Sequence, residues 1–413
     1  MTEDPHDHQH SVLRQARRDR TGQKRIFVGV VAAIAVATLI GLVALWPSGD
    51  AEFKLGTGPV GDTQKGEIKT VVSEECPPPR KGTCTDADVE ILEGDEEGKV
   101  VPIQISTGGP TASYEVGDKV RVAKVQFTPA ADQFEATQAE PVYSLIDFER
   151  RAPMLWLAIA FSLLVIVFGR LRGALSLVGL AASLGVVLLF IVPAILDGTS
   201  PLAVALVGSM AVMLITISLA HGVGPKSLAA ILGTAFSLLL VGLLAVFFTG
   251  LTNLTGFSSE EATALAIGDS GISISGLLIA GIVIGALGVL DDVTISQAST
   301  VLALRAANPS QRFGALYRRA IDVGRDHVSA TVNTLVLAYV GSSLPVLVIL
   351  GSGQLGLVDA LNLELIAKEI VATLVGSIGL IAAVPITTAL AALMADTLTD
   401  EELNEAAEGG HHH

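Results

Sequence analysis

The chain has 413 residues, of which 50% are hydrophobic and 16% are charged, and its formal net charge is −15. Soluble proteins carry about a quarter charged residues, so this composition argues against a soluble enzyme. The acidic balance argues against nucleic acid as a partner. The hydrophobic residues gather in runs of about 20, long enough for a helix to cross about 30 Å of hydrocarbon. We predict a polytopic α-helical membrane protein with about eight transmembrane helices and a small extracytoplasmic β-rich domain between the first two.

The chain starts with a polar tail over residues 1–25 that ends in a basic cluster, and an apolar run follows over 26–46. This run is longer than the apolar stretch of a signal peptide and has no small-x-small cleavage site before Trp46. We therefore expect a retained membrane anchor, with its basic flank holding the N-terminal tail in the cytoplasm.

Residues 47–150 differ in kind from the rest of the chain. Stretches such as Val-Val-Pro-Ile-Gln-Ile-Ser alternate apolar and polar residues, and Gly, Pro and Asp interrupt them. This periodicity is typical of short strands and predicts a small β-rich domain. Carboxylates outnumber basic residues in this domain, which fits either an ordinary solvated surface or a cation-attracting vestibule above a pore.

The two cysteines of the chain, Cys76 and Cys84, both lie in this segment and bracket a proline-rich turn. An even pair in a polar loop predicts a disulfide where the segment faces an oxidising compartment. Because no histidines lie nearby, the pair is a poor zinc site, and the sequence leaves any metal unassigned.

Seven further apolar segments form a predicted bundle over 151–396. They cover residues 153–169, 173–196, 201–220, 228–250, 272–290, 328–350 and 366–395. Basic residues gather in alternate connecting loops, and the other loops carry carboxylates instead. By the positive-inside rule, both termini lie in the cytoplasm and the β-rich domain lies outside. Residues 397–413 are then an acidic cytoplasmic tail that ends in a partial histidine tag.

The sixth apolar segment ends in an adjacent pair of carboxylates, Asp291 and Asp292, at its predicted cytoplasmic boundary. Neighbouring helix positions face about 100° apart, so the two side chains are not expected to share one partner. An acidic pair at a helix C-terminus opposes the helix dipole and requires a cation, a proton or a basic residue. A role in an ion or substrate pathway and a structural salt bridge both remain open.

The same segment carries Gly281, Gly285 and Gly288 at helical spacing. Small residues on one helix face allow a neighbouring helix to approach closely. This face is predicted to serve helix packing, either within the chain or in a homo-oligomer.

The seventh segment brings polar side chains to the membrane. Asp326 and Asn333 fall on one helix stripe, and Thr334 adjoins it. Arg325 is the candidate charge partner of the aspartate pair, and His327 is either a proton-binding group or a structural histidine. Lining of a transport pathway and polar packing between helices are the two interpretations of this segment.

The last segment contains Pro385, which interrupts the helical hydrogen bonds near two threonines. Such a break inside a membrane helix often lines a cavity. The chain has no P-loop, no dinucleotide fingerprint, no His-Glu-x-x-His motif and no nucleophile elbow. We therefore expect neither enzyme activity nor a cofactor.

Two blocks of the sequence resemble the YibE/F family of bacterial multipass membrane proteins. They read Gly-Ala-Leu-Gly-Val-Leu-Asp-Asp-Val-Thr-Ile-Ser-Gln-Ala-Ser from Gly285 and Asn-Thr-Leu-Val-Leu-Ala-Tyr-Val-Gly-Ser-Ser-Leu-Pro from Asn333. The segments Tyr-Ser-Leu-Ile-Asp-Phe-Glu-Arg-Arg from Tyr143 and Gly-Arg-Leu-Arg-Gly from Gly169 are also similar. The resemblance implies a multipass protein of the bacterial cytoplasmic membrane, of the permease type.

Our leading hypothesis is a membrane transporter for a small solute or ion, coupled to protons or cations and lined by polar residues of the last three helices. The alternative is a non-transporting scaffold or sensor whose external domain binds a partner in the cell envelope. The expected partners are the lipid bilayer and the transported solute, with a homo-oligomer left open.

Overall fold

The computed structural model describes residues 5–48, 63–76, 82–107, 112–125, 142–267, 271–352, 356–399 and 402–403. The chain divides into two compact units, Lys54–Leu164 and the combination of Met1–Phe53 with Val165–His413. Each unit is treated by itself below. Most of the predicted acidic tail, including the partial histidine tag, lies outside the described residues.

The unit Lys54–Leu164 contains a five-stranded antiparallel sheet. Its strands are β1 (Thr63–Glu75), β2 (Thr83–Ile91), β3 (Val100–Thr107), β4 (Lys119–Val125) and β5 (Val142–Phe148), in the spatial order β3-β2-β1-β4-β5. One face of the sheet packs a small core in which Ile68, Val89 and Val120 are fully buried. The alternation of apolar and polar residues along the strands produces this one-sided core, and the predicted β-rich domain is confirmed.

Cys76 and Cys84 form a disulfide, with their Cα atoms 4.9 Å apart. The bond joins the end of β1 to the start of β2, where Glu74 pairs with Cys84 in the ladder. Both cysteines are buried. The predicted disulfide is therefore confirmed, and it joins the two strands at the end of the hairpin where the chain passes from β1 to β2.

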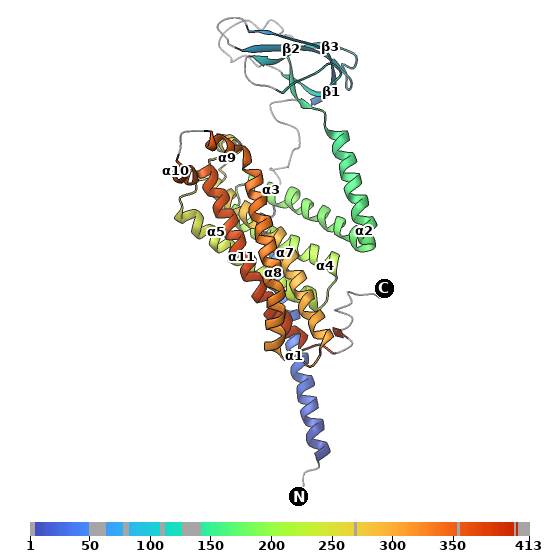
Figure 1. Cartoon of the computed structure of the whole chain (residues 1–413). Helices are drawn as coiled ribbons and strands as arrows, with labels where there is room; N and C mark the ends of the chain where they lie inside the picture. Colours follow the sequence, from blue (N-terminus) through green and yellow to red (C-terminus); the bar gives the residue numbers. More distant parts are fainter. Residues whose placement is uncertain are drawn as a thin grey trace. The chain divides into compact units, whose positions relative to one another are not determined.

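The rest of the chain is mainly helical. Its helices are α1 (Pro5–Ala44), α2 (Arg151–Val186), α3 (Val192–Leu196), α4 (Pro201–His221), α5 (Pro225–Leu251), α6 (Glu260–Ile267), α7 (Ile274–Ala307), α8 (Phe313–Ser342), α9 (Leu344–Gly351), α10 (Leu357–Asn362) and α11 (Glu364–Ala395), with a π-helical turn, η1 (Val187–Ile191), between α2 and α3. Figure 1 follows these elements along the chain.

Six of the described helical stretches are long and apolar enough to cross a membrane, or seven if α8 and α9, which are bent by 62°, form one span. The bend falls where Pro345 opens α9, because proline cannot donate the hydrogen bond that would continue α8. One of the six is the 46-residue stretch Arg151–Leu196. Its backbone leaves the helical conformation at Arg170, with φ 51° and ψ −133°. The helical membrane architecture is confirmed, and the count of eight helices stays a prediction.

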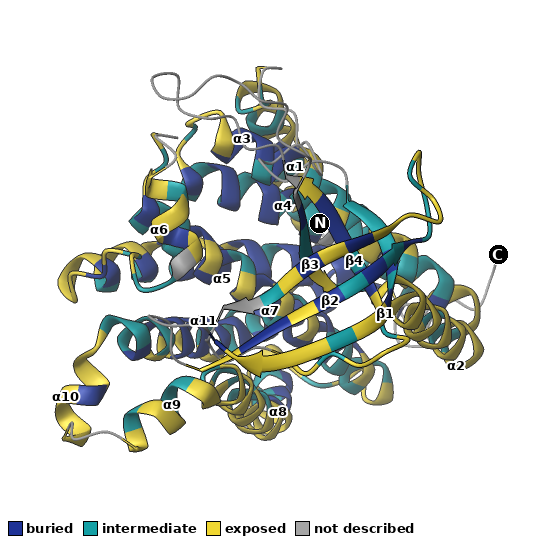
Figure 2. Cartoon of the chain, turned by 90° about the horizontal axis from the view of Figure 1, so that it is seen from above, coloured by how far each residue is buried: buried dark blue, intermediate teal, exposed yellow. Residues whose placement is uncertain are grey.

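Helices α5, α7 and α11 form the centre of the helical unit, and Figure 2 shows that most of its buried positions lie on them and on α4. Glycines allow α5 and α11 to pack closely, since a Cβ at Gly233 would collide with Thr387 and one at Gly379 would collide with Val241. By contrast, α8, α9 and α10 are largely exposed.

The structure corrects the predicted end of the sixth apolar segment. That segment was expected to stop at residue 290, whereas α7 continues as a regular helix to Ala307. The aspartate pair consequently lies in the interior of a helix and does not face its C-terminal dipole. The prediction failed because Gln, Ser and Thr residues lower the hydropathy after residue 291, although they face other helices and do not end the helix.

Candidate functional site

Helix α7 contacts α4, α5, α8 and α11, so its polar side chains meet four neighbours. Asp291, Thr294 and Gln297 follow one another at intervals of three residues and therefore fall on one face. Together with threonines of the neighbouring helices they form what we call the polar seam. Its members are Thr216 of α4, Thr234 of α5, Asp291, Thr294 and Gln297 of α7, and Thr387 and Thr388 of α11.

Asp291 has two carboxylate oxygens in different situations. Its Oδ2 accepts a hydrogen bond from the Thr216 hydroxyl at 2.9 Å. Its Oδ1 is buried and has no hydrogen-bond partner among the described residues. A buried carboxylate oxygen without a donor is costly inside a protein and more so within a membrane, and the cost is relieved by a proton or a cation. Asp291 is therefore the ionisable member of the seam, and its Oδ1 atom is open to a proton or a cation.

Thr234 and Thr294 connect α5 to α7 about one helical turn beyond Asp291. Their hydroxyl oxygens lie 2.6 Å apart, and both side chains are fully buried. The Thr294 hydroxyl also lies 3.1 Å from the backbone carbonyl of Asp291. Because hydroxyls both donate and accept, this pair is able to reverse its direction of donation without moving a heavy atom.

Gln297 joins three helices. Its side-chain Nε2 donates to the backbone carbonyl of Ala320 on α8 at 2.9 Å and to the hydroxyl of Thr388 on α11 at 2.7 Å. Gly324 makes room for it, since a Cβ there would lie 2.8 Å from the Gln297 Oε1 atom. The Thr388 hydroxyl in turn donates to the Val384 carbonyl at 2.6 Å. The Gln297 amide nitrogen and the Thr388 hydroxyl thus have hydrogen-bond partners, which fits a structural role at this end of the seam.

Pro385 lies inside α11 and cannot donate a backbone hydrogen bond to the preceding turn. Two residues later, the Thr387 hydroxyl is buried against Gly233 and lacks a hydrogen-bond partner within the described part of the chain. The buried hydroxyls of Ser237 on α5 and Ser377 on α11 also lack partners there. Unpaired hydroxyls thus continue along the contact between α5 and α11, and buried polar groups of this kind call for an explanation.

The family described as YibE/F-like protein matches residues 157–397, more than half of the chain. The chain belongs to the YibE/F family. The match begins within α2 and ends just after α11, so it contains the whole polar seam and leaves out the five-stranded sheet. No curated protein and no solved structure matches the chain.

Within the YibE/F segment, the other residues predicted for the pathway lie away from the seam. Asp292 is exposed on α7, about 100° around the helix from Asp291. On α8, Arg325, Asp326, His327, Asn333 and Thr334 are also exposed. Arg325 forms its ion pair with Asp322 one turn earlier, at 3.1 Å, and does not pair with either member of the aspartate pair. The structure thus separates the predicted set into Asp291 and Pro385, which are partly buried, and six residues that are exposed.

The predicted glycine face of this YibE/F protein is exposed in the same way. A Cβ at Gly281 or Gly288 would meet no atom within 4 Å, and one at Gly285 would meet the Tyr339 hydroxyl at 3.5 Å. Within the described part of the chain, close helix approaches occur at other glycines, among them Gly233, Gly324 and Gly379. The expected packing role of the α7 glycines is therefore not seen within the described part of this chain.

Sequence reasoning missed Gln297, Thr294 and Thr216. A usable signal was present, because polar residues recur every three positions from Asp291 to Gln297 in an otherwise apolar helix. Thr216 is a single threonine in α4 and only the packing of α4 on α7 brings it to Asp291. No group of three or more His, Cys, Asp or Glu side chains in the described ranges is placed to hold a metal ion.

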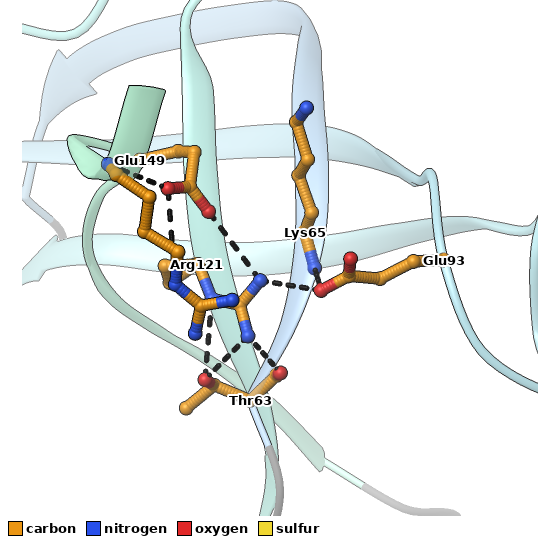
Figure 3. Close-up of polar contacts among 6 residues, drawn as sticks. Thr63, Lys65, Glu93, Arg121 and Glu149 are labelled. Atoms are coloured by element: carbon orange, nitrogen blue, oxygen red, sulfur yellow. Dashed lines mark hydrogen bonds and ion pairs between the residues drawn. The ribbon is translucent and has the colours of Figure 1, made fainter. Parts of the chain in front are cut away.

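The β unit has a polar centre of its own around Arg121 on β4, which Figure 3 shows. The guanidinium group donates to the backbone carbonyl of Thr63 and to its hydroxyl, at 2.8 Å in the latter case. It also pairs with Glu93 and, at 3.4 Å, with Glu149. Burial opposes ionisation of Glu93, yet hydrogen bonds from Arg121 and from the Lys65 N–H hold its pKa below the ordinary value.

Proposed function

We propose that this YibE/F protein is a membrane transporter that moves a small solute or ion, coupled to a proton or cation bound at Asp291. One observation carries the proposal: a carboxylate in a candidate membrane helix has one buried oxygen without a hydrogen-bond partner among the described residues. Ionisable groups inside membrane helices are costly and mark ion and proton paths. A purely structural aspartate would be expected to have both oxygens satisfied.

The surroundings of Asp291 support movement of a charge. Thr216 donates to the carboxylate, and the hydroxyl pair Thr234–Thr294 lies beside the backbone carbonyl of the same residue, so exchangeable hydroxyls lie on both sides of Asp291 along α7. Farther along, Pro385 and the unpaired Thr387 hydroxyl provide a discontinuity in α11 of the kind found in transporters. The role predicted for Asp292 and the exposed α8 side chains is a separate part of the proposal, and the test below addresses Asp292.

The proposal includes eight crossings, with both termini in the cytoplasm and the β domain outside. At 1.5 Å per residue, 46 residues would extend about 69 Å, far more than the roughly 30 Å of a bilayer core. Division of this stretch at Arg170 gives two spans, and α8 with α9 gives one. The basic residues at that break and at the start of α5 then face the cytoplasm. The Cys76–Cys84 disulfide fits an oxidising exterior.

The direct test is flux through the purified full-length protein in sealed liposomes. A pH-sensitive dye inside the vesicles reports proton movement, while a panel of ions and small solutes is applied outside. We expect flux for at least one solute, with proton or cation coupling. Asp291→Asn should reduce this flux to the level of empty vesicles, because it keeps an acceptor for Thr216 and removes the ionisable group.

Asp322→Asn is the matched control, since it removes a carboxylate from the exposed face of α8. It should leave flux unchanged. Asp292→Asn decides whether the second aspartate takes part. Normal flux in Asp291→Asn would contradict the site, and absence of flux for every solute would contradict transport.

The alternative function is a scaffold or sensor that binds a cell-envelope partner through the β domain. The observation in its favour is that this domain forms a compact unit with its own core and disulfide. It predicts no flux, and cross-linking of the full-length protein in cells should then capture one envelope partner through β-domain residues.

A further inference from the structure

A cavity of about 980 Å³ lies at one end of the helical unit, where α4 ends and α5 begins. Its walls come from four parts of the chain that are distant in sequence: α1, the part of α2 that follows Arg170, the α4–α5 turn and the short C-terminal stretch at residues 402–403. Its volume is at the upper end of the range for small-molecule pockets, which is about 300–1,000 Å³. The cavity is separate from the polar seam, since the two share no residue.

The charged side chains that line this cavity are mainly cationic. Lys24, Arg172 and Lys226 contribute positive charge, and His221 is also part of the wall. The single carboxylate of the wall, Glu402, is engaged by Lys24 at 2.6 Å. Neither Arg172 nor Lys226 has an ion-pair partner within the described parts of the chain. Two like charges therefore face one cavity with no counter-charge of their own among the described residues, and an anion between them would relieve their mutual repulsion.

The start of α5 adds backbone donors to the same wall. Its first helical hydrogen bond runs from the Leu228 N–H to the Gly224 carbonyl at 2.9 Å, so the N–H groups of Lys226 and Ser227 precede it. Gly224 has no side chain to cap them. Ser227 is also not available as a cap, because its hydroxyl donates to the Gly222 carbonyl at 2.6 Å. Free N–H groups beside two cations suit an anion with several oxygens.

We propose that this cavity binds a phosphate-bearing anion through Arg172, Lys226 and the first N–H groups of α5. Phosphate presents several strong acceptor oxygens and more than one negative charge, which matches two unpaired cations and backbone donors converging on one space. The phosphate belongs either to the headgroup of an anionic lipid or to a free molecule. A basic pocket between membrane helices is the kind of site that binds anionic headgroups. The inference does not rest on transport at Asp291.

The experiment uses the full-length protein in detergent and asks which phosphate source it retains. Native mass spectrometry measures binding of added cardiolipin against phosphatidylcholine, and calorimetry measures binding of inorganic phosphate. The test variant is Arg172→Gln with Lys226→Gln. The matched control is Arg318→Gln with Arg319→Gln, which removes two exposed arginines from α8, outside the cavity.

We expect cardiolipin to bind in preference to phosphatidylcholine, and the Arg172/Lys226 variant to weaken that binding by about 30-fold, given the usual contribution of two basic residues near a lipid surface. The α8 control should bind as the unmodified protein does. If inorganic phosphate binds and is lost in the same variant while cardiolipin shows no preference, the free anion is the ligand. Equal binding by the test and control variants would overturn the proposal, as would absence of binding for both probes.

A second variant tests the site even if the Arg172/Lys226 variant does not fold. Val223 lines the cavity and is 83% exposed, so Val223→Glu adds a negative charge at the rim and leaves both cations and the packing in place. It should weaken binding of the same probe in a folded protein. Undiminished binding in Val223→Glu would also overturn the proposed site.

Discussion

The polar centre of the β domain and the polar seam of the helical bundle are built from similar side chains but differ in how completely they are paired. Arg121 is only 12% exposed, and it bonds to two carboxylates and to Thr63. Asp291 is partly buried, with its Oδ1 atom out of contact with solvent, yet only one of its oxygens has a donor among the described residues. Clusters in which every polar group has a hydrogen-bond partner stabilise a fold. A buried acceptor without a donor is available for binding a cation or a proton.

The largest effect is expected from removal of Arg121. In Arg121→Met, the Glu149 carboxylate, which is 9% exposed, loses the Arg121 guanidinium and keeps the longer ion pair with Arg151 at 4.0 Å. Breaking a buried pair from one side costs about 3 kcal/mol at the lower end of its range, which applies here because one cation remains. Hydrogen exchange of the strand amides in the full-length protein should report this loss in β1 and β4. Lys124→Met on the same strand is the control, because its ion pair is exposed and contributes about 0–1 kcal/mol. Equal effects of the two variants would show that the Arg121 cluster is not a structural centre.

The next effect concerns the paired end of the seam. Gln297→Leu keeps the volume but leaves the Ala320 carbonyl and the Thr388 hydroxyl without the Gln297 donor. We expect a loss of about 1–3 kcal/mol in the free energy of unfolding, measured by denaturation in detergent micelles. Asn333→Leu, at an exposed position of α8, should change stability by no more than about 0.5 kcal/mol. If Gln297→Leu left the free energy of unfolding unchanged, the hydrogen bonds of Gln297 would not stabilise the bundle.

A smaller effect is expected from the pH dependence of the β domain. The pKa of Glu93 is held below its ordinary value of 4.5 in the folded state. Its contribution to stability is therefore complete above pH 4.5 and is lost as the pH falls below that value. Strand protection measured by hydrogen exchange should weaken on acidification through this window. In Glu93→Gln, strand protection should depend less steeply on pH. If its pH dependence were the same as in the unmodified protein, ionised Glu93 would not contribute to the stability of the domain.

The smallest effect on stability, and the most informative, is expected at Asp291. Asp291→Asn retains an acceptor for Thr216 and removes a charge that is only partly paired, so the free energy of unfolding should change by less than about 0.5 kcal/mol. Flux in liposomes should nevertheless disappear. A loss of stability like that of Gln297→Leu would place Asp291 among the structural groups and end the contrast between the two regions.

Local sequence patterns predicted the features that depend on one segment at a time. The strand alternation of 47–150 and the pairing of Cys76 with Cys84 were correct, because a two-residue period and a short loop constrain their own neighbourhood. The apolar runs likewise marked the helical spans. The end of α7 was predicted wrongly because hydropathy alone treats buried Gln and Thr residues as a boundary, although these side chains find partners on other helices.

The choice of site residues depended on which face of each helix is covered, and no local pattern contains that information. The sequence marks Asp291 and Asp292 equally, as it does the polar residues of α8. Packing of α4, α5 and α11 around one face of α7 covers part of Asp291, including its Oδ1 atom, and leaves Asp292 exposed. The sequence by itself determines that this YibE/F protein is a membrane protein with a disulfide-bearing β domain, because length, period and hydropathy are local quantities. Which polar groups are buried, paired or left open was decided by the tertiary structure alone, because burial and pairing require neighbours from elsewhere in the chain.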